Sequence, residues 1–207
     1  MGDAGVSTAL VVVASPRPTS FAHAMAERAT RTLRRHGVEC RVHDLYAEDF
    51  RPVAGPEETF TAGLDAEAAI AASGDELVRR HRRTLSDADH LVVAHPNWWG
   101  KPPAIMAGWI DRVVVPGVAY RLAERDGLPQ PLLQLRSVLV LNTGDTAPTR
   151  ERDVFGDPLE LIWRRCVGSY LGDVRVERVL AGPLGDSTQE QRDSWLQDVE
   201  RAAVAWT

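Results

Sequence analysis

Two adjacent tryptophans, Trp98 and Trp99, stand in the segment HPNWWGKPPAIMAGWIDRVVVPGVAY, which runs from residue 95 to residue 120. The prolines around the pair are Pro96, Pro102 and Pro103. Because proline lacks a backbone N–H and disfavours a helix at the residue before it, the tryptophans are expected on a loop. Indole rings on a stiffened loop can stack on a planar ring system, and backbone amides up to Gly100 can reach ring heteroatoms. The alternative is that the indoles pack on a helix or a second subunit.

A polar loop, SPRPTSFAH, follows the first apolar run of the chain. It lacks the glycines of dinucleotide-binding and triphosphate-binding loops. Directly before an expected helix it offers Ser15, Arg17, Thr19 and Ser20. Hydroxyl groups, one cation and the free N–H groups of a helix start can together hold a phosphate. The alternative is that Thr19 or Ser20 merely caps the helix.

Another polar loop, NTGDTAP, follows a later apolar run, and its first residues are Asn142, Thr143, Gly144 and Asp145. These residues could hold the edge of a ring, although the same residue types form ordinary turns. No Ser-His-Asp or Cys-His arrangement stands out, and His23 and His95 are each as compatible with a structural role. A bound cofactor, rather than a side chain, is therefore expected to carry the chemistry.

Alternating strand and helix patterns position these loops. Strands are expected at residues 8–14, 39–46, 90–95, 137–142 and 174–180. Helices are expected at 20–36, 75–85, 103–113, 157–169 and 188–206, with Ser20 and either Ser187 or Thr188 as N-caps and Gly37 as a stop signal. The alternation predicts one doubly wound parallel α/β domain over residues 1–207, with a surface excursion at 47–73 and a second excursion at 114–136. The ends of strands 1, 3 and 4 then share the edge of the sheet where ligands of such folds bind.

Composition excludes several classes of partner. The net charge of −5 gives no support for binding nucleic acid or an anionic membrane. The first apolar run is too short to span a membrane, and no His/Cys cluster has the spacing of metal ligands. The two cysteines, Cys40 and Cys166, are expected to be buried in a strand and a helix. We expect a cytoplasmic protein without a metal.

The segment 95–120 resembles the signature of the flavodoxin-like NAD(P)H:quinone oxidoreductases. This family includes the mammalian quinone reductases, bacterial modulators of drug activity and the ancillary oxidoreductases of potassium efflux systems. PTSFAHAM is similar to the family's flavin phosphate loop, and NTGD is similar to its segment beside the flavin ring. The resemblance covers residues 8–180. It implies a flavodoxin-like five-stranded parallel sheet of order 2-1-3-4-5 with helices on both faces, a homodimer, a flavin (FAD or FMN) and NAD(P)H as co-substrate.

Carried over by position, the resemblance assigns roles to individual residues. It puts the flavin phosphate near Ser15, Thr19, Ser20 and Phe21. It puts along the ring Pro96, Asn97, Trp98 and Trp99, and at the opposite polar edge Asn142, Thr143 and Gly144. Trp99 matches the aromatic residue that lies beside both flavin and substrate, and Tyr120 is expected at the rim of the pocket or in the dimer contact.

Three departures from the family pattern bear on the site. Gly100 replaces an aromatic residue, which is expected to widen the pocket, and Asp145 replaces a glycine, which adds a negative charge near the flavin. Thr149 and Phe155 stand where the mammalian enzymes have a tyrosine and a histidine that are proposed to relay protons. The relay is therefore not carried over to this chain.

The resulting hypothesis is a flavin-dependent oxidoreductase in which NAD(P)H reduces a quinone or similar electron-poor acceptor by ping-pong hydride transfer. One alternative is a regulatory or ancillary protein that binds a partner protein and has weak redox activity. Another is a flavin reductase that acts on azo or nitro compounds or on a biosynthetic intermediate. A third is a pocket that has lost its affinity for flavin. The sequence does not distinguish FAD from FMN or NADH from NADPH, and it does not identify the acceptor.

Overall fold

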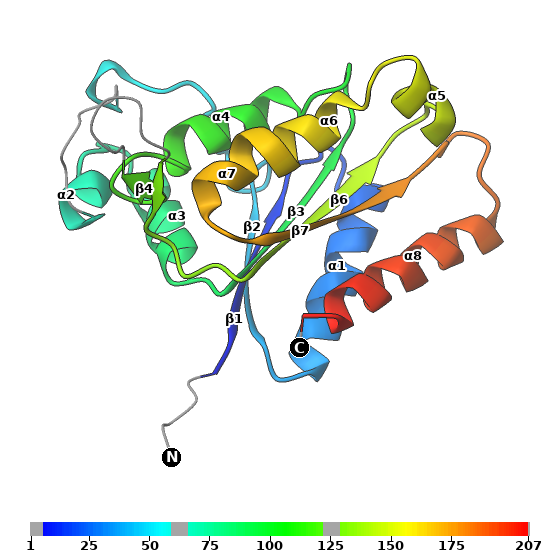
Figure 1. The fold of residues 1–207 in the computed structure, drawn as a ribbon, viewed down its shortest axis with the longest axis horizontal. Coiled ribbons are helices and arrows are strands. Elements are labelled where there is room, and N and C mark those ends of the chain that lie inside the picture. The colour runs from blue at the N-terminus through cyan, green and yellow to red at the C-terminus, as the bar shows by residue number, and fades with distance from the viewer. Residues whose placement is uncertain (1–5, 59–65, 122–128, 207) are drawn as a thin grey trace.

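A five-stranded parallel sheet organises the chain (Figure 1). The computed structural model describes residues 6–58, 66–121 and 129–206. The strands in spatial order are β2 (Glu39–Asp44), β1 (Thr8–Val13), β3 (His90–Pro96), β6 (Ser137–Thr143) and β7 (Arg175–Ala181). All neighbouring pairs are parallel. Because β6 and β7 are the predicted fourth and fifth strands, the predicted order 2-1-3-4-5 is confirmed.

Helices cover both faces of the sheet (Figure 1). On one face lie α1 (Phe21–Arg35) and α8 (Gln189–Val204). On the other lie α3 (Glu76–Ser86), α4 (Ala104–Val113), α6 (Pro158–Glu160), the π-helical turn η2 (Leu161–Val167) and α7 (Gly168–Leu171). In β1, Leu10 and Val12 join the core beneath the second group, whereas Val11 and Val13 join the core beneath α1 and α8. A strand covered on both faces needs such a continuous apolar run.

The predicted helix ends are largely confirmed. Ser20 is the N-cap of α1, and Gly37, with φ of +81°, follows its last turn. Thr188, rather than Ser187, caps α8 and forms a capping box with Gln191. Helix α8 thereby starts immediately after the loop that follows β7.

The excursion at 47–73 is only partly a surface segment, which corrects the prediction. It contains a short turn, η1 (Pro56–Glu58), and the unpredicted helix α2 (Ala66–Ala71), while residues 59–65 lie outside the described part of the chain. The Glu58 carboxylate lies 2.7 Å from Nε of Arg112 and 3.5 Å from NH2 of Arg82, and all three side chains are buried. A buried ion pair of this kind anchors the segment to α3 and α4.

Two histidines and a glutamate fasten the start of the same excursion. Glu48 lies 3.0 Å from Nδ1 of His43 and 2.9 Å from Nε2 of His81. Burial opposes ionisation of Glu48, but these hydrogen bonds outweigh it and hold the pKa of Glu48 well below its usual range. The indole N–H of Trp109 donates to Nδ1 of His81, so Nε2 of His81 carries a proton and donates to Glu48. His43, Glu48 and His81 could otherwise ligate a metal ion. In this tautomer, however, Nε2 of His81 carries a proton and has no lone pair to offer a metal.

The excursion at 114–136 contains a two-stranded antiparallel ribbon, β4 (Tyr120–Arg121) and β5 (Gln130–Pro131), with residues 122–128 outside the described part. The cysteine prediction is wrong for Cys166, which is exposed because it lies on the solvent side of η2. Cys40 is half-buried, and this burial raises the pKa of its thiol. None of the helices in the described residues has the length and apolar character needed to cross a membrane.

Candidate functional site

The tryptophan pair lies on a tight turn at the end of β3. The backbone N–H of Trp98 donates to the carbonyl of Lys101 at 3.1 Å, and the reverse bond is 3.2 Å. The two residues between them, Trp99 and Gly100, have φ of +60° and +71°. Two successive positive φ values define a type I′ turn, which glycine tolerates and tryptophan resists. The turn leaves Trp99 96% exposed, so a strained backbone holds an aromatic ring in solvent.

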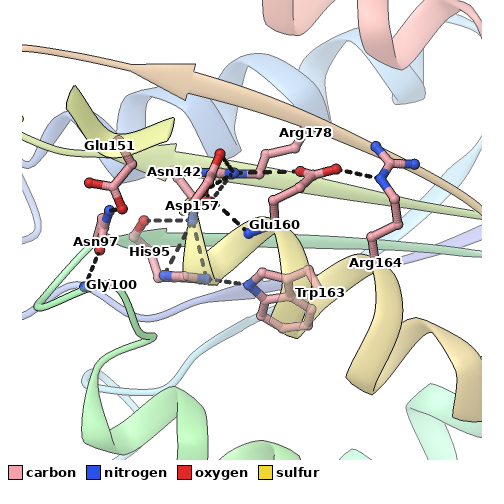
Figure 2. A network of polar contacts seen from close by, with 10 residues as sticks. All are labelled: His95, Asn97, Gly100, Asn142, Glu151, Asp157, Glu160, Trp163, Arg164 and Arg178. Carbon is pink, nitrogen blue, oxygen red and sulfur yellow. Dashed lines mark hydrogen bonds and ion pairs between the residues drawn. The ribbon is translucent and has the colours of Figure 1, made fainter. Parts of the chain in front are cut away.

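Asn97 ties this turn to the rest of the site (Figure 2). Its Oδ1 accepts from the backbone N–H of Gly100 at 2.9 Å, and its Nδ2 donates to Oε1 of Glu151 at 2.8 Å. Glu151 belongs to α5 (Pro148–Asp153), a helix that the sequence analysis did not predict. One side chain therefore fixes the loop after β3 against the loop after β6.

A cavity of about 510 Å³ opens between these two loops, within the usual size range of ligand pockets. It is lined by Asn97, Trp99, Gly100, Gly144, Asp145, Thr146, Glu151, Phe155, Pro158 and Leu180. Five residues predicted for the site are among them. The lining does not include Pro96, Trp98, Asn142, Thr143 or the predicted residues of the loop after β1. Of the two tryptophans, Trp99 therefore borders the cavity and Trp98 does not.

Two structural features favour glycine at position 100, and the sequence analysis missed both. Its φ of +71° favours glycine, and an added Cβ would lie 2.9 Å from Cγ of Pro158. The expected widening of the pocket stays a prediction. Asp145 is exposed, lines the cavity and accepts a hydrogen bond from the backbone N–H of Gly185 at 2.9 Å.

A polar network centred on His95 joins β3, β6, β7 and the segment that follows α5 (Figure 2). The indole N–H of Trp163 donates to Nε2 of His95 at 3.0 Å, and Nδ1 of His95 donates to the Pro96 carbonyl at 2.9 Å. Both contacts require the neutral Nδ1–H tautomer. Burial lowers the pKa of His95 from 6.5 to about 4, and the nearby Arg178 adds to this effect. His95 is therefore a neutral structural residue, one of the two roles that the sequence left open.

The side chain of Asn142 belongs to this network, so only the backbone of this residue is left for its predicted contact with the edge of a bound ring. Its side chain is fully buried, its Nδ2 lies 3.2 Å from Nε2 of His95, and its Oδ1 accepts from Nε of Arg178 at 2.8 Å. Asn142 lies within β6, which continues through Thr143, and it is the register partner of His95 in β3. Its side chain consequently has no group free for a ligand.

Arg178 connects the network to the segment that follows α5. Its NH1 lies 2.7 Å from one carboxylate oxygen of Asp157 and 2.8 Å from the other. Asp157 has φ of +45° and is the N-cap of α6, and Glu160 binds Arg164 in the next turn. The sequence analysis missed this pairing because Arg178 and Asp157 lie on elements that only the fold brings together.

The loop after β1 lies at the same edge of the sheet. Ser20 Oγ lies 2.9 Å from Nδ1 of His23, and Nε2 of His23 lies 2.9 Å from Oδ2 of Asp44. The first turn of α1 contains no acidic residue of its own, and the positive end of a helix dipole favours an anion. Capping by Ser20 is confirmed, whereas phosphate binding stays a prediction. The ring of Phe21 packs edge-on against Trp195 of α8.

The remaining predicted positions lie at the rim or away from the cavity. Phe155 lines the cavity with its ring half exposed, and the guanidinium carbon of Arg150 lies 5.3 Å from that ring's centroid. Thr149 is exposed on α5. Tyr120 lies outside the cavity lining and packs edge-on against Tyr170, with ring centroids 4.7 Å apart.

The sheet order and the helix layers define a doubly wound α/β fold of the flavodoxin type, with a cavity at the carboxyl ends of β3 and β6. The chain belongs to the family described as having a flavodoxin-like fold, whose model matches residues 7–202.

Three similar proteins illustrate the family. NAD(P)H dehydrogenase [quinone] 1 of Cavia porcellus is 31% identical over 171 residues, which are 77% of this chain and 62% of that protein. The chain therefore spans less than two thirds of that relative's length. Ribosyldihydronicotinamide dehydrogenase [quinone] of Mus musculus is 30% identical over 209 residues, covering 91% of this chain and 88% of that protein. The solved NAD(P)H:quinone oxidoreductase from Methanothermobacter marburgensis shares the fold, with a TM-score of 0.80, 23% identity, and coverage of 98% of this chain and 100% of that one.

Proposed function

We propose that this protein is a flavin-dependent oxidoreductase that uses NAD(P)H to reduce a quinone or a similar electron-poor acceptor. The observation that carries the proposal is Trp99, held almost fully exposed at the cavity by a left-handed turn. Backbone strain of this kind persists where function requires it. The names of the relatives reported above support a redox activity on quinones.

The residues present fit a flavin. The start of α1 offers backbone N–H groups and the hydroxyl of Ser20 for a phosphate. Trp99 and the backbone from Gly144 to Asp145 border a cavity at the same edge of the sheet. A flavin bound there would pass hydride from a nicotinamide to the acceptor. The protein would orient the ring against Trp99 and exclude water, while the Asn97 bridge keeps the two loops at a fixed separation.

We further infer a cytoplasmic homodimer. Neither cysteine is in a disulfide, which suits a reducing compartment. Four large apolar side chains are exposed, and a second copy of the chain could cover them; these are Trp99 and Phe155, which line the cavity, and Val154 and Leu161. Reconstituting the protein with FAD and with FMN, and assaying each form with NADH and with NADPH, identifies the preferred flavin and the preferred nicotinamide.

A second candidate is reduction of azo or nitro compounds. Its support is Phe155, an apolar ring at the cavity where the family's mammalian enzymes have a histidine. No histidine lines the described cavity, so a proton relay of the mammalian kind has no counterpart there. An ancillary role beside a partner protein would instead appear as slow NAD(P)H oxidation with every acceptor.

The test begins with the visible spectrum of the purified protein and mass analysis of any released cofactor. NAD(P)H oxidation is then measured against a naphthoquinone, an azo dye and a nitroaromatic at equal concentration. The proposal expects bound flavin, parallel lines in double-reciprocal plots, and the highest kcat/KM for the quinone. A protein that binds neither flavin at saturating concentration and does not oxidise NAD(P)H would contradict it.

A further inference from the structure

A buried carboxylate faces the cavity that Trp99 borders. Glu151 is 3% exposed, yet it is one of the lining residues. Its Oε1 accepts from Asn97, and no donor to its Oε2 is found among the described residues. A buried carboxylate normally gains several hydrogen bonds or a cation. Glu151 has one hydrogen bond and an oxygen available to whatever occupies the cavity.

The orientation of Glu151 is fixed by its partner (Figure 2). The amide of Asn97 cannot turn over, because its Oδ1 must face the N–H of Gly100 and its Nδ2 must face Glu151. The backbone N–H of Asn97 donates to the Thr143 carbonyl at 2.6 Å, which holds this residue to β6. The carboxylate is therefore pre-positioned before a ligand enters.

Within the described part of the chain, no cation neutralises this charge inside the cavity. The lining residues that the structure describes include no lysine, arginine or histidine, whereas a second carboxylate, Asp145, is among them. Arg178 is paired with Asp157. Arg150 is exposed and lies over Phe155 at the rim, where water screens its charge.

We propose that Glu151 makes the site selective for the charge of the electron acceptor, and this inference rests on the function proposed above. The site accepts neutral or cationic ring compounds and disfavours those that carry a sulfonate or carboxylate. Repulsion between like charges is several times stronger in a water-excluding pocket than in bulk water. A ring substituent with an N–H or O–H group gains a hydrogen bond to the free Oε2. Asp145 contributes less because it is exposed.

The test compares 1,4-naphthoquinone with 1,4-naphthoquinone-2-sulfonate in the full-length protein. The variant is Glu151→Gln, which keeps the volume and the acceptor for Asn97. The comparison variant is Asp145→Asn, and Glu190→Gln on the exposed start of α8 is the matched control. Dissociation constants are measured by quenching of tryptophan fluorescence with and without flavin, and kcat/KM is measured with NAD(P)H. Circular dichroism establishes that each variant is folded.

Glu151→Gln should raise the ratio of sulfonate to parent quinone at least about tenfold, both in affinity and in kcat/KM. Asp145→Asn should improve the sulfonate about threefold or less, since an exposed charge is screened, and Glu190→Gln should change nothing. Three results would overturn the inference. They are an unchanged preference in both carboxylate variants, an equal change for the two quinones, and failure of both quinones to bind. A protein that lacks flavin and turnover but shows the shifted binding preference would contradict only the proposed function.

Discussion

The buried neutral histidine predicts a loss of stability in mild acid. Burial lowers the pKa of His95 from 6.5 to about 4. Below pH 6.5 the unfolded chain binds a proton at this residue that the folded chain does not, so the free energy of unfolding falls as the pH falls. At about 1.4 kcal/mol per unit of pKa, the difference amounts to about 3 kcal/mol below pH 4. About 2 kcal/mol of this is lost between pH 7 and pH 5.

The assay is urea unfolding followed by circular dichroism at pH 7, 6 and 5. His95→Gln removes the titrating ring and keeps an acceptor for Trp163, while His36→Gln at an exposed position is the control. The native chain and His36→Gln should each lose about 2 kcal/mol more than His95→Gln between pH 7 and pH 5. His95→Gln is expected to start from a lower stability, so only the change with pH is compared. Parallel profiles for all three proteins would refute the assignment of a neutral buried imidazole.

Three further substitutions test the packing around the site. Gly108→Ala should lower the free energy of unfolding by about 2 kcal/mol or more, because the new Cβ would lie 2.0 Å from the Pro52 carbonyl oxygen. This loss should exceed the gain from alanine's better helix propensity, and an unchanged free energy of unfolding in urea would contradict it. Arg178→Met should cost about 2 kcal/mol by leaving Asp157 unpaired, and the added Asp157→Asn change should recover part of the loss in the same assay. Gly100→Ala should lower the melting temperature by an amount worth about 1 kcal/mol, because φ is +71°, and an unchanged melting curve would contradict the turn geometry.

The sheet and its main helices follow from local pattern. TALVVVA predicts β1 because a strand covered on both faces must be apolar at consecutive positions, as Leu10 and Val11 illustrate by facing opposite cores. Ser20 and Gly37 predict the ends of α1 for reasons confined to a few residues. Such features depend on near neighbours in the sequence, so they can be read without knowing the fold.

The site was only partly predictable because its decisive contacts join distant segments. Trp99 was found by its residue type and position in a proline-rich loop. Glu151 was missed, since its role depends on Asn97, 54 residues earlier in the chain. The burial of the Asn142 side chain was not predicted, because its partners Arg178 and His95 lie on other strands.

The prediction of a surface segment between β2 and α3 was partly wrong for a similar reason. Its composition predicted a surface segment, yet Glu58 reaches Arg112 on α4 and is buried with it. Charged residues such as Glu58 and Arg112 can be buried when each has a partner of opposite charge. Sequence alone does not reveal which partner that is.

The central claim is that a flavin ring lies against Trp99, and the affinity of the protein for flavin tests it most directly. FMN and FAD are titrated separately into cofactor-free protein, and quenching of flavin fluorescence gives the dissociation constants. Trp99→Ala should weaken binding of the better flavin about tenfold, as expected for the loss of one stacking contact, whereas Trp98→Ala, outside the cavity lining, should weaken it about threefold or less. Equal affinity of Trp99→Ala and the native chain would contradict the account.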